Sequence, residues 1–266
     1  MRATEALGRA MGGLLSPIAG EGSLLRRARL FHPDGVLFRA DVRPLARDGA
    51  AGELAQRVAG PALVRLSSAW WRHEKELPDV LGIAVRFCGR APTAMSVEAS
   101  ARDQDLLFAT FQHIWSLPFA PLTTNVHDYL ANEYHAILPF YVLGLGRVKF
   151  RLVPGRQRET RGSRRERLER AVAAGNAVLR LEVTQAGALG ARLRSPEQSL
   201  RMSRWEAVAL IDLEERSLVD QEALSFTPFH AGRGIMPVGP FQMLRAATYA
   251  ASHAGRKVAS IEGSSR

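Results

Sequence analysis

Cysteine is almost missing from this 266-residue chain, in which Cys88 stands alone. A single cysteine excludes an intramolecular disulfide and any metal site built from several thiolates. Such scarcity is typical of a reducing compartment, so we expect a cytoplasmic protein. The chain also lacks a run of about 18 uncharged apolar residues, so we expect no membrane-spanning helix. Glu5, Gly8 and the pair Gly12-Gly13 interrupt the first residues, and this pattern argues against a secretory signal.

Lysine is scarce too: Lys75, Lys149 and Lys257 are the only lysines among 36 basic residues, so the net charge of +10 comes almost entirely from arginine. Guanidinium groups suit carboxylates and phosphates. The charge is therefore compatible with nucleic acid, an anionic membrane surface or an acidic small ligand, and equally with a genomic base bias that has no function. The densest basic run, residues 156–170, mixes arginine with glutamate and holds no aromatic residue. Platforms for single-stranded nucleic acid interleave aromatic side chains, so we expect a solvated loop and helix start here.

Short apolar and β-branched segments recur from residue 35 onward, separated by Gly, Pro, Asp or charged turns. Recurring short strands at this spacing are typical of a meandering antiparallel sheet or barrel. The expected strands are Val36–Val42, Ala62–Ser67, Ile83–Phe87, Thr93–Val97, Leu106–Phe111, Val148–Leu152, Val178–Val183 and Val208–Leu213.

Helical patterns are fewer. We expect a glycine-interrupted helix and loop over residues 1–28, a helix over Asn125–Tyr134 capped by Asn125 or Thr124, and a helix that ends near Ala174. A last helix is expected near Phe241–His253. Many strands followed by a closing helix predict a single α+β domain over residues 1–266.

The last expected helix carries a stripe of chemistry-bearing residues. Arg245, Tyr249 and Arg256 are four and seven positions apart and share one helix face if the helix reaches Arg256. Positive charge beside a phenol favours its anion, and a tyrosinate is a suitable ligand for ferric haem iron. An amphipathic surface helix with a packed tyrosine explains the same spacing.

A second group lies in the first third of the chain. Arg29 precedes His32 by three residues, and Arg65 and Ser67 point to the same face of one expected strand. A serine hydroxyl that fixes the tautomer of a histidine prepares that histidine for acid–base work on a peroxide. A purely structural histidine is the alternative.

The chain resembles a reduced member of the haem catalase superfamily, because four motifs occur in the order in which that superfamily has them. These motifs are Arg29-x-x-His32, Val64–Ser68, Gly82–Phe87, and Arg245-x-x-x-Tyr249 with Arg256 seven residues later. Leu224–Phe229 and Pro237–Gly239 are similar to the approach to the last helix in short catalase-related proteins.

The resemblance implies an α+β fold, a catalase-like antiparallel β-barrel with peripheral helices that binds one haem b, residues 240–256 being the proximal helix. It also implies a role for each matching residue. Tyr249 is the expected ligand of the haem iron and Arg245 keeps it anionic, while His32 is the distal catalytic residue, oriented by Ser67. The haem propionates are expected to pair with Arg29, Arg65 and Arg256.

The chain also departs from the catalase pattern. Where catalases have an asparagine that polarises peroxide, the alignment of Asp105–Thr110 offers Thr110 or Ala109. The loop after His32 is two residues shorter, and Ala251 replaces an aspartate beyond the proximal tyrosine. The long arm and C-terminal helical domain of full-length catalases have no counterpart here, so their tetramer is not implied and a homo-oligomer stays open.

The expected function is therefore haem-dependent turnover of hydrogen peroxide or an organic hydroperoxide, with Thr110 lining the pocket. Peroxidase, peroxygenase and hydroperoxide-rearranging activities fit, the last being that of allene oxide synthases, and weak catalase activity is compatible. The alternatives are a haem carrier or sensor without turnover, and a metal-dependent phosphodiesterase without haem. For the latter, His127 and His135 are eight residues apart, about 12 Å along a helix and too far to share one ion without a bend.

Overall fold

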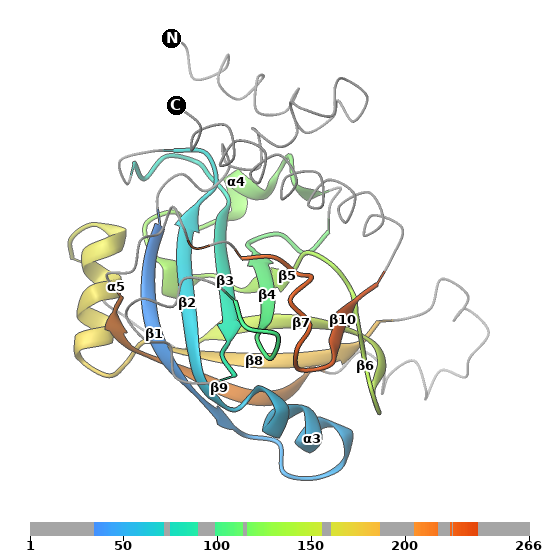
Figure 1. Ribbon diagram of the computed structural model, residues 1–266. Helices are drawn as coiled ribbons and strands as arrows, with labels where there is room; N and C mark the ends of the chain where they lie inside the picture. The colour runs from blue at the N-terminus through green and yellow to red at the C-terminus, as the bar shows by residue number, and fades with distance from the viewer. Residues whose placement is uncertain are drawn as a thin grey trace, which may run out of the picture.

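An antiparallel β-barrel dominates the computed structural model, which describes residues 35–71, 75–89, 99–113, 116–155, 161–186, 205–217, 224 and 226–238 (Figure 1). Around the barrel the strand order is β7-β5-β4-β3-β2-β1-β9-β8, and β8 pairs with β7 to close it. The eight strands are β1 (Gly35–Pro44), β2 (Gly60–Ser68), β3 (Leu81–Phe87), β4 (Gln104–Ala109), β5 (Tyr134–Ala136), β7 (Gly146–Pro154), β8 (Val178–Gln185) and β9 (Glu206–Arg216).

Two short strands extend the sheet beyond the barrel. β6 (Phe140–Val142) pairs with the start of β7, and β10 (Ile235–Pro237) pairs with β6. Gly144 and Gly146 have φ of +85° and +74° in the turn between β6 and β7. Glycine adopts this left-handed conformation without the steric penalty that other residues meet.

The predicted fold class is confirmed: the molecule is an α+β antiparallel barrel with few helices. The expected strands within the described ranges coincide with barrel strands, namely β1, β2, β3, β4, β7, β8 and β9, except that β4 ends at Ala109, two residues before the expected end at Phe111. Residues 93–97, expected as a strand, lie outside the described ranges, as do residues 1–28 and the last expected helix.

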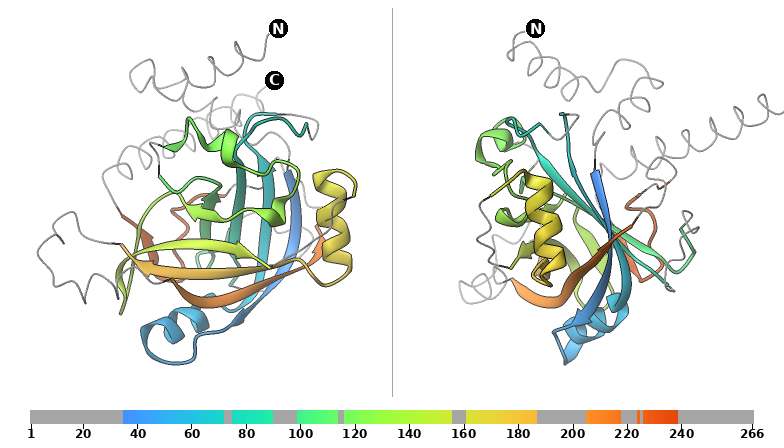
Figure 2. Two further views of the ribbon diagram at one scale, coloured as in Figure 1. Left: turned by 180° about the vertical axis from the view of Figure 1, so that it is seen from behind. Right: turned by 90° about the vertical axis from the view of Figure 1, so that its left-hand side faces the viewer.

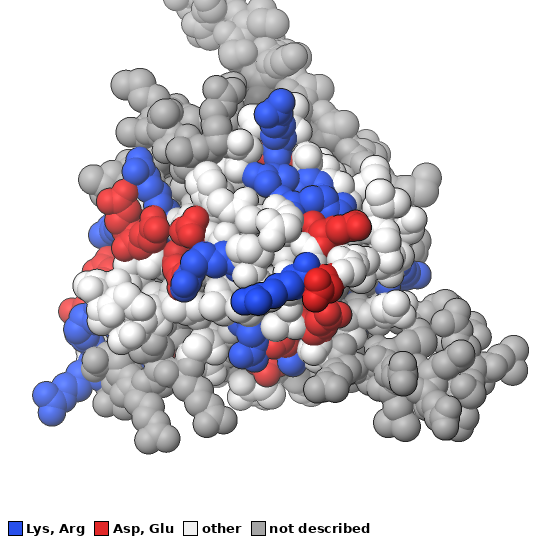
Figure 3. Space-filling view, turned by 90° about the horizontal axis from the view of Figure 1, so that it is seen from below, with Lys and Arg blue, Asp and Glu red and all other residues white. Residues whose placement is uncertain are grey.

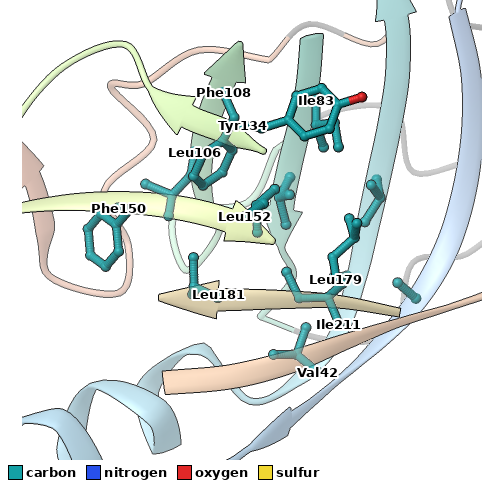
Figure 4. Close-up of a cluster of buried hydrophobic side chains, with 14 of the residues drawn as sticks. Val42, Ile83, Leu106, Phe108, Tyr134, Phe150, Leu152, Leu179, Leu181 and Ile211 are labelled. Carbon is teal, nitrogen blue, oxygen red and sulfur yellow. The ribbon is translucent and has the colours of Figure 1, made fainter. Parts of the chain in front are cut away.

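The barrel interior is filled by apolar side chains at every second position of each strand. Phe38, Val64, Val85 and Phe108 are examples from four consecutive neighbours in the sheet, and each is at most 2% exposed. Figure 4 shows buried side chains from strands all around the barrel, including Tyr134 of β5, Phe150 of β7 and Leu181 of β8, which point into its interior. Because side chains alternate between the two faces, the intervening residues of each strand lie on the outside of the barrel.

Among the described residues, two ten-residue helices pack against the barrel. α3 (Gly49–Val58) lies across one end (Figures 1 and 2), where Leu54, Ala55 and Val58 join the core. α5 (Arg164–Ala173) packs beside β9 and adds Leu168 to the core. Ser163 and Glu166 form a reciprocal capping box at its start, which explains why the helix begins at Arg164, within the arginine-rich run.

The expected helix over residues 125–134 is wrong. This segment holds only a single turn of 3₁₀-helix, η2 (Tyr129–Ala131), after the short helix α4 (Ala120–Thr123), and it ends in β5. Polar side chains explain the difference: the Asn132 amide donates to the carbonyls of Asn125 and Asp128, and Asp128 accepts from the N–H of Leu130. Such local bonds compete with helix formation.

Within the described ranges, no helix has the length and apolar character needed to span a bilayer. The basic excess does not form a field of one sign on the face seen in Figure 3, where basic and acidic side chains lie next to one another.

Candidate functional site

The outer face of β1–β4 carries a row of very small side chains. Gly35 pairs with Ser67, Ser67 with Gly82 and Gly82 with Ala109, so the four residues form one line across four strands. Directly paired residues point to the same face of a sheet. We call Gly35, Ser67, Gly82 and Ala109, together with Ala84 from the next row, the small-residue floor.

Arg65 lies in the next row of the same face. It pairs with Leu37 on one side and with Ala84 on the other, and Ala84 pairs in turn with Leu107. Arg65, Ala84 and Leu107 are only half-buried, whereas Ser67 is 4% exposed. The fold therefore brings Arg65 and Ser67 together on one face, as the strand pattern predicts, with a guanidinium beside a flat, small-residue surface.

Thr110 and Ala109 lie differently. Ala109 belongs to the floor, in line with Ser67. The Thr110 hydroxyl instead accepts a hydrogen bond from the N–H of Leu81 at 3.2 Å and lies 2.8 Å from the Thr124 hydroxyl. Thr110 thus connects the end of β4 to β3 and to the end of α4.

A buried charged network, which the sequence analysis missed, lies one row beyond Arg65. Arg86 donates to both carboxylate oxygens of Asp105, at 2.8 and 2.9 Å, and the two residues are 2% and 0% exposed. Asp105 also accepts from the N–H of Thr227 at 3.0 Å and lies 2.8 Å from Nδ1 of His230. Although burial lowers the pKa of Arg86, its bonds to Asp105 outweigh this and raise that pKa above its ordinary value.

This network holds residues 226–230 against the outside of the barrel. The Arg86 guanidinium lies 5.0 Å from the centre of the Phe226 ring, and Leu224 packs with Leu37, Leu63 and Cys88. Burial raises the pKa of the Cys88 thiol to about 12, so this thiol stays protonated and unreactive near neutral pH. The sequence signal for the network was the presence of charges in the otherwise apolar strands β3 and β4.

The other predicted site residues lie outside the described ranges. They are Arg29, His32, Arg245, Tyr249 and Arg256. Their roles remain predictions.

The residues of the metal-hydrolase alternative are not brought together. His127 Nδ1 lies 2.6 Å from a carboxylate oxygen of Glu76, while His135 contacts the Trp205 ring at a centroid distance of 6.2 Å. Glu76 also accepts from the N–H of Arg164, so this group fastens the start of α5. In the part of the chain that the structure describes, no three His, Cys, Asp or Glu side chains gather so that they could hold a metal ion.

Comparison with known proteins supports the fold. No protein-family model and no curated protein matches the sequence. Among solved structures, a fungal catalase superposes with a TM-score of 0.53 at 12% sequence identity. The match covers 82% of this chain and 58% of the catalase chain, so this chain corresponds to little more than half of that protein. The similarity establishes a catalase-like fold.

Proposed function

We propose that this protein binds haem b against the small-residue floor and acts on hydrogen peroxide or an organic hydroperoxide. One observation carries the proposal: on a catalase-like barrel, Ser67, Gly82 and Ala109 form a line on one outward face, next to the Arg65 guanidinium. The motif order along the sequence supports it independently.

Two features of the described residues support the proposal, the small side chains of the floor and the guanidinium beside them. Gly82, Ala84 and Ala109 project almost nothing from the sheet, and Ala109 also packs with Val80 and Ala120 at one end of the floor. Haem b also carries two carboxylates, and the fork of donors on an arginine side chain matches a carboxylate at two points. The donor set on this face would therefore suit the group, with the Arg65 guanidinium for a haem carboxylate and the Ser67 hydroxyl for the distal histidine.

Each residue has a distinct task in this proposal. Bound haem supplies the redox chemistry that cleaves a peroxide O–O bond. Tyr249 ligates the iron as a phenolate, and Arg245 favours that anion. His32 takes a proton from the peroxide oxygen and returns it to the departing one, and the Ser67 hydroxyl fixes its tautomer.

The remaining residues hold the group and shape its surroundings. Arg29, Arg65 and Arg256 bind the propionates in this proposal. Thr110 lines the pocket through its position at the end of β4, and its hydroxyl keeps the end of α4 in place.

A haem carrier or sensor without turnover is the second candidate, and Ala109 favours it. The methyl group of Ala109 lies in line with Ser67 and has no hydrogen-bond donor. Catalases use an amide in this region to polarise peroxide. Turnover of a cumene hydroperoxide probe separates the two candidates, because an enzyme consumes many equivalents whereas a carrier only loses its haem absorbance.

The test of haem binding is the absorption spectrum of the full chain after titration with ferric haem. We expect a tyrosinate-ligated ferric spectrum in the wild type and its loss in Tyr249→Phe. Tyr141→Phe is the matched control, because Tyr141 is a tyrosine of β6 that is 47% exposed. A wild type that leaves the spectrum of free haem unchanged would overturn the proposal, and a Tyr249→Phe spectrum identical to wild type would remove Tyr249 from it.

A further inference from the structure

Gly35 and Arg65 approach each other more closely than any side chain at position 35 would permit. A Cβ atom built on Gly35 would lie 2.7 Å from the central guanidinium carbon of Arg65, 2.8 Å from Nη2 and 2.9 Å from Nε. Carbon atoms in contact are ordinarily about 3.5–4.0 Å apart. The guanidinium therefore occupies the space that a side chain at position 35 would fill.

The backbone does not explain this glycine. Described glycines with positive φ include Gly60 at +100° and Gly234 at +72°, and Gly35 is not one of them. Gly35 starts a regular strand, β1, whose pairing with β2 begins at this residue. A strand position with ordinary φ accepts any L-residue, so what glycine provides here is space.

The register of β1 and β2 shows where the guanidinium lies. Arg65 pairs with Leu37, and Gly35 pairs with Ser67, so Arg65 reaches its diagonal neighbour across the strand pair. Long side chains span this diagonal. The guanidinium consequently lies at the β1 edge of the small-residue floor.

We propose that Gly35 is a positioning residue that keeps the guanidinium of Arg65 at the β1 edge of the floor, where it binds a carboxylate of the haem. This inference rests on the proposed function and adds to it a residue that selects the carboxylate-bearing form of the ligand. A methyl group at position 35 moves the flexible end of the Arg65 side chain and leaves the strand pairing in place.

The test compares ferric haem with its dimethyl ester, in which both carboxylates are masked. Affinity is measured by absorbance titration of the full chain in the wild type, Gly35→Ala, Arg65→Met and Gly155→Ala. Gly155 is the matched control, because it also lacks a positive φ and its built Cβ makes only an ordinary contact, 3.6 Å from the Val178 carbonyl oxygen. Thermal unfolding of the haem-free proteins verifies that each variant folds.

We expect wild type and Gly155→Ala to prefer haem over its ester by roughly tenfold or more, because a hydrogen bond to a charged group contributes on that scale. Gly35→Ala is expected to lose most of this preference, as Arg65→Met does, with an unchanged unfolding temperature. If Gly35→Ala keeps the wild-type preference while Arg65→Met loses it, the inference is overturned and the proposed function stands. Equal affinities for both ligands in all four proteins overturn the inference and leave haem binding intact, whereas failure of the wild type to bind either ligand overturns both.

Discussion

Two regions on the outside of the barrel use the same interaction in opposite surroundings. On β3 and β4, Arg86 bridges to Asp105 with side chains that are 3% and 0% exposed. At the seam between β1 and β9, Arg43 bridges to Asp212 with side chains that are 61% and 24% exposed. Each pair joins an arginine on one strand to a carboxylate on its neighbour.

The two ion pairs differ in how far protein groups replace water around the carboxylate. The Asp105 carboxylate has taken up two arginine N–H groups, a backbone N–H and an imidazole nitrogen, so its contacts with water are replaced by protein. The seam pair keeps much of its hydration, and water screens it. At the Arg86–Asp105 pair, β3 and β4 are thus buried on both faces, whereas β1 and β9 are buried on one face only at the Arg43–Asp212 pair.

The largest expected effect comes from breaking the buried pair. Asp105→Ala leaves a buried guanidinium, an imidazole and the N–H of Thr227 without their acceptor, and we expect a loss of about 3–5 kcal/mol in the free energy of unfolding. Asp212→Ala at the seam is expected to lose at most about 1 kcal/mol. Urea denaturation of both variants measures the contrast, and equal losses would contradict it.

A double substitution sharpens the same comparison. Arg86→Met combined with Asp105→Leu removes both charges and keeps apolar volume, so it is expected to recover most of the stability lost in Asp105→Ala. If the double variant is as unstable as Asp105→Ala, the loss of stability does not come from an unpaired buried charge. The hydrogen bonds of the network would then be what stabilises the fold.

Asp79 provides the next contrast, since it is a buried carboxylate that hydrogen-bonds to backbone N–H groups of Trp70, Trp71 and Val80. Burial raises its pKa from 3.8 to about 6, against the effect of these donors. The folded state therefore binds a proton more readily than the unfolded state between these two values. Through this group, stability is greatest below about pH 4 and falls as pH rises through about 6.

We therefore expect wild type to lose stability relative to Asp79→Asn as the pH is raised from about 4 to 7. Denaturation curves at several pH values give the difference between the two proteins directly. A difference that stays constant over this range would refute the role of Asp79.

The two peripheral helices give the smallest expected effect. Ser163 accepts from the N–H of Glu166 at the start of α5, whereas Asp48 makes no side-chain bond at the start of α3. Ser163→Ala should lower the free energy of unfolding by about 1 kcal/mol, and Asp48→Ala by at most about 0.5 kcal/mol. Urea denaturation of the two variants measures both losses in the free energy of unfolding. A larger loss for Asp48→Ala than for Ser163→Ala would contradict the capping role of Ser163.

Most barrel strands were predictable, because their alternating apolar residues must fill one interior. The pattern also placed Arg65 and Ser67 on one face, since a strand has a period of two residues. It failed over residues 125–134, where the Asn132 amide donates to the Asp128 carbonyl and the Asp128 carboxylate accepts from the N–H of Leu130, and these local bonds outweigh the helical pattern.

The buried network of Arg86, Asp105 and His230 could not be predicted from the sequence, for a different reason. Arg86 and Asp105 are 19 residues apart, and His230 follows Asp105 by 125 residues. Only the register of β3 with β4 and the path of the segment after β9 bring them together. The contact of Arg65 with Gly35 likewise depends on the register of β1 with β2. The roles of His32 and Tyr249 stay predictions.

The central claim is that haem lies on the small-residue floor, and haem titration of Ala84→Leu and Ala207→Leu tests it most directly. Both alanines are half-buried on the outside of the barrel, but Ala84 belongs to the floor, whereas Ala207 pairs with Glu182 on the opposite half. The extra side-chain volume in Ala84→Leu should weaken haem binding roughly tenfold or more, while Ala207→Leu should bind as the wild type does. Equal haem affinity in the two variants, each with a cooperative unfolding transition, would contradict the account.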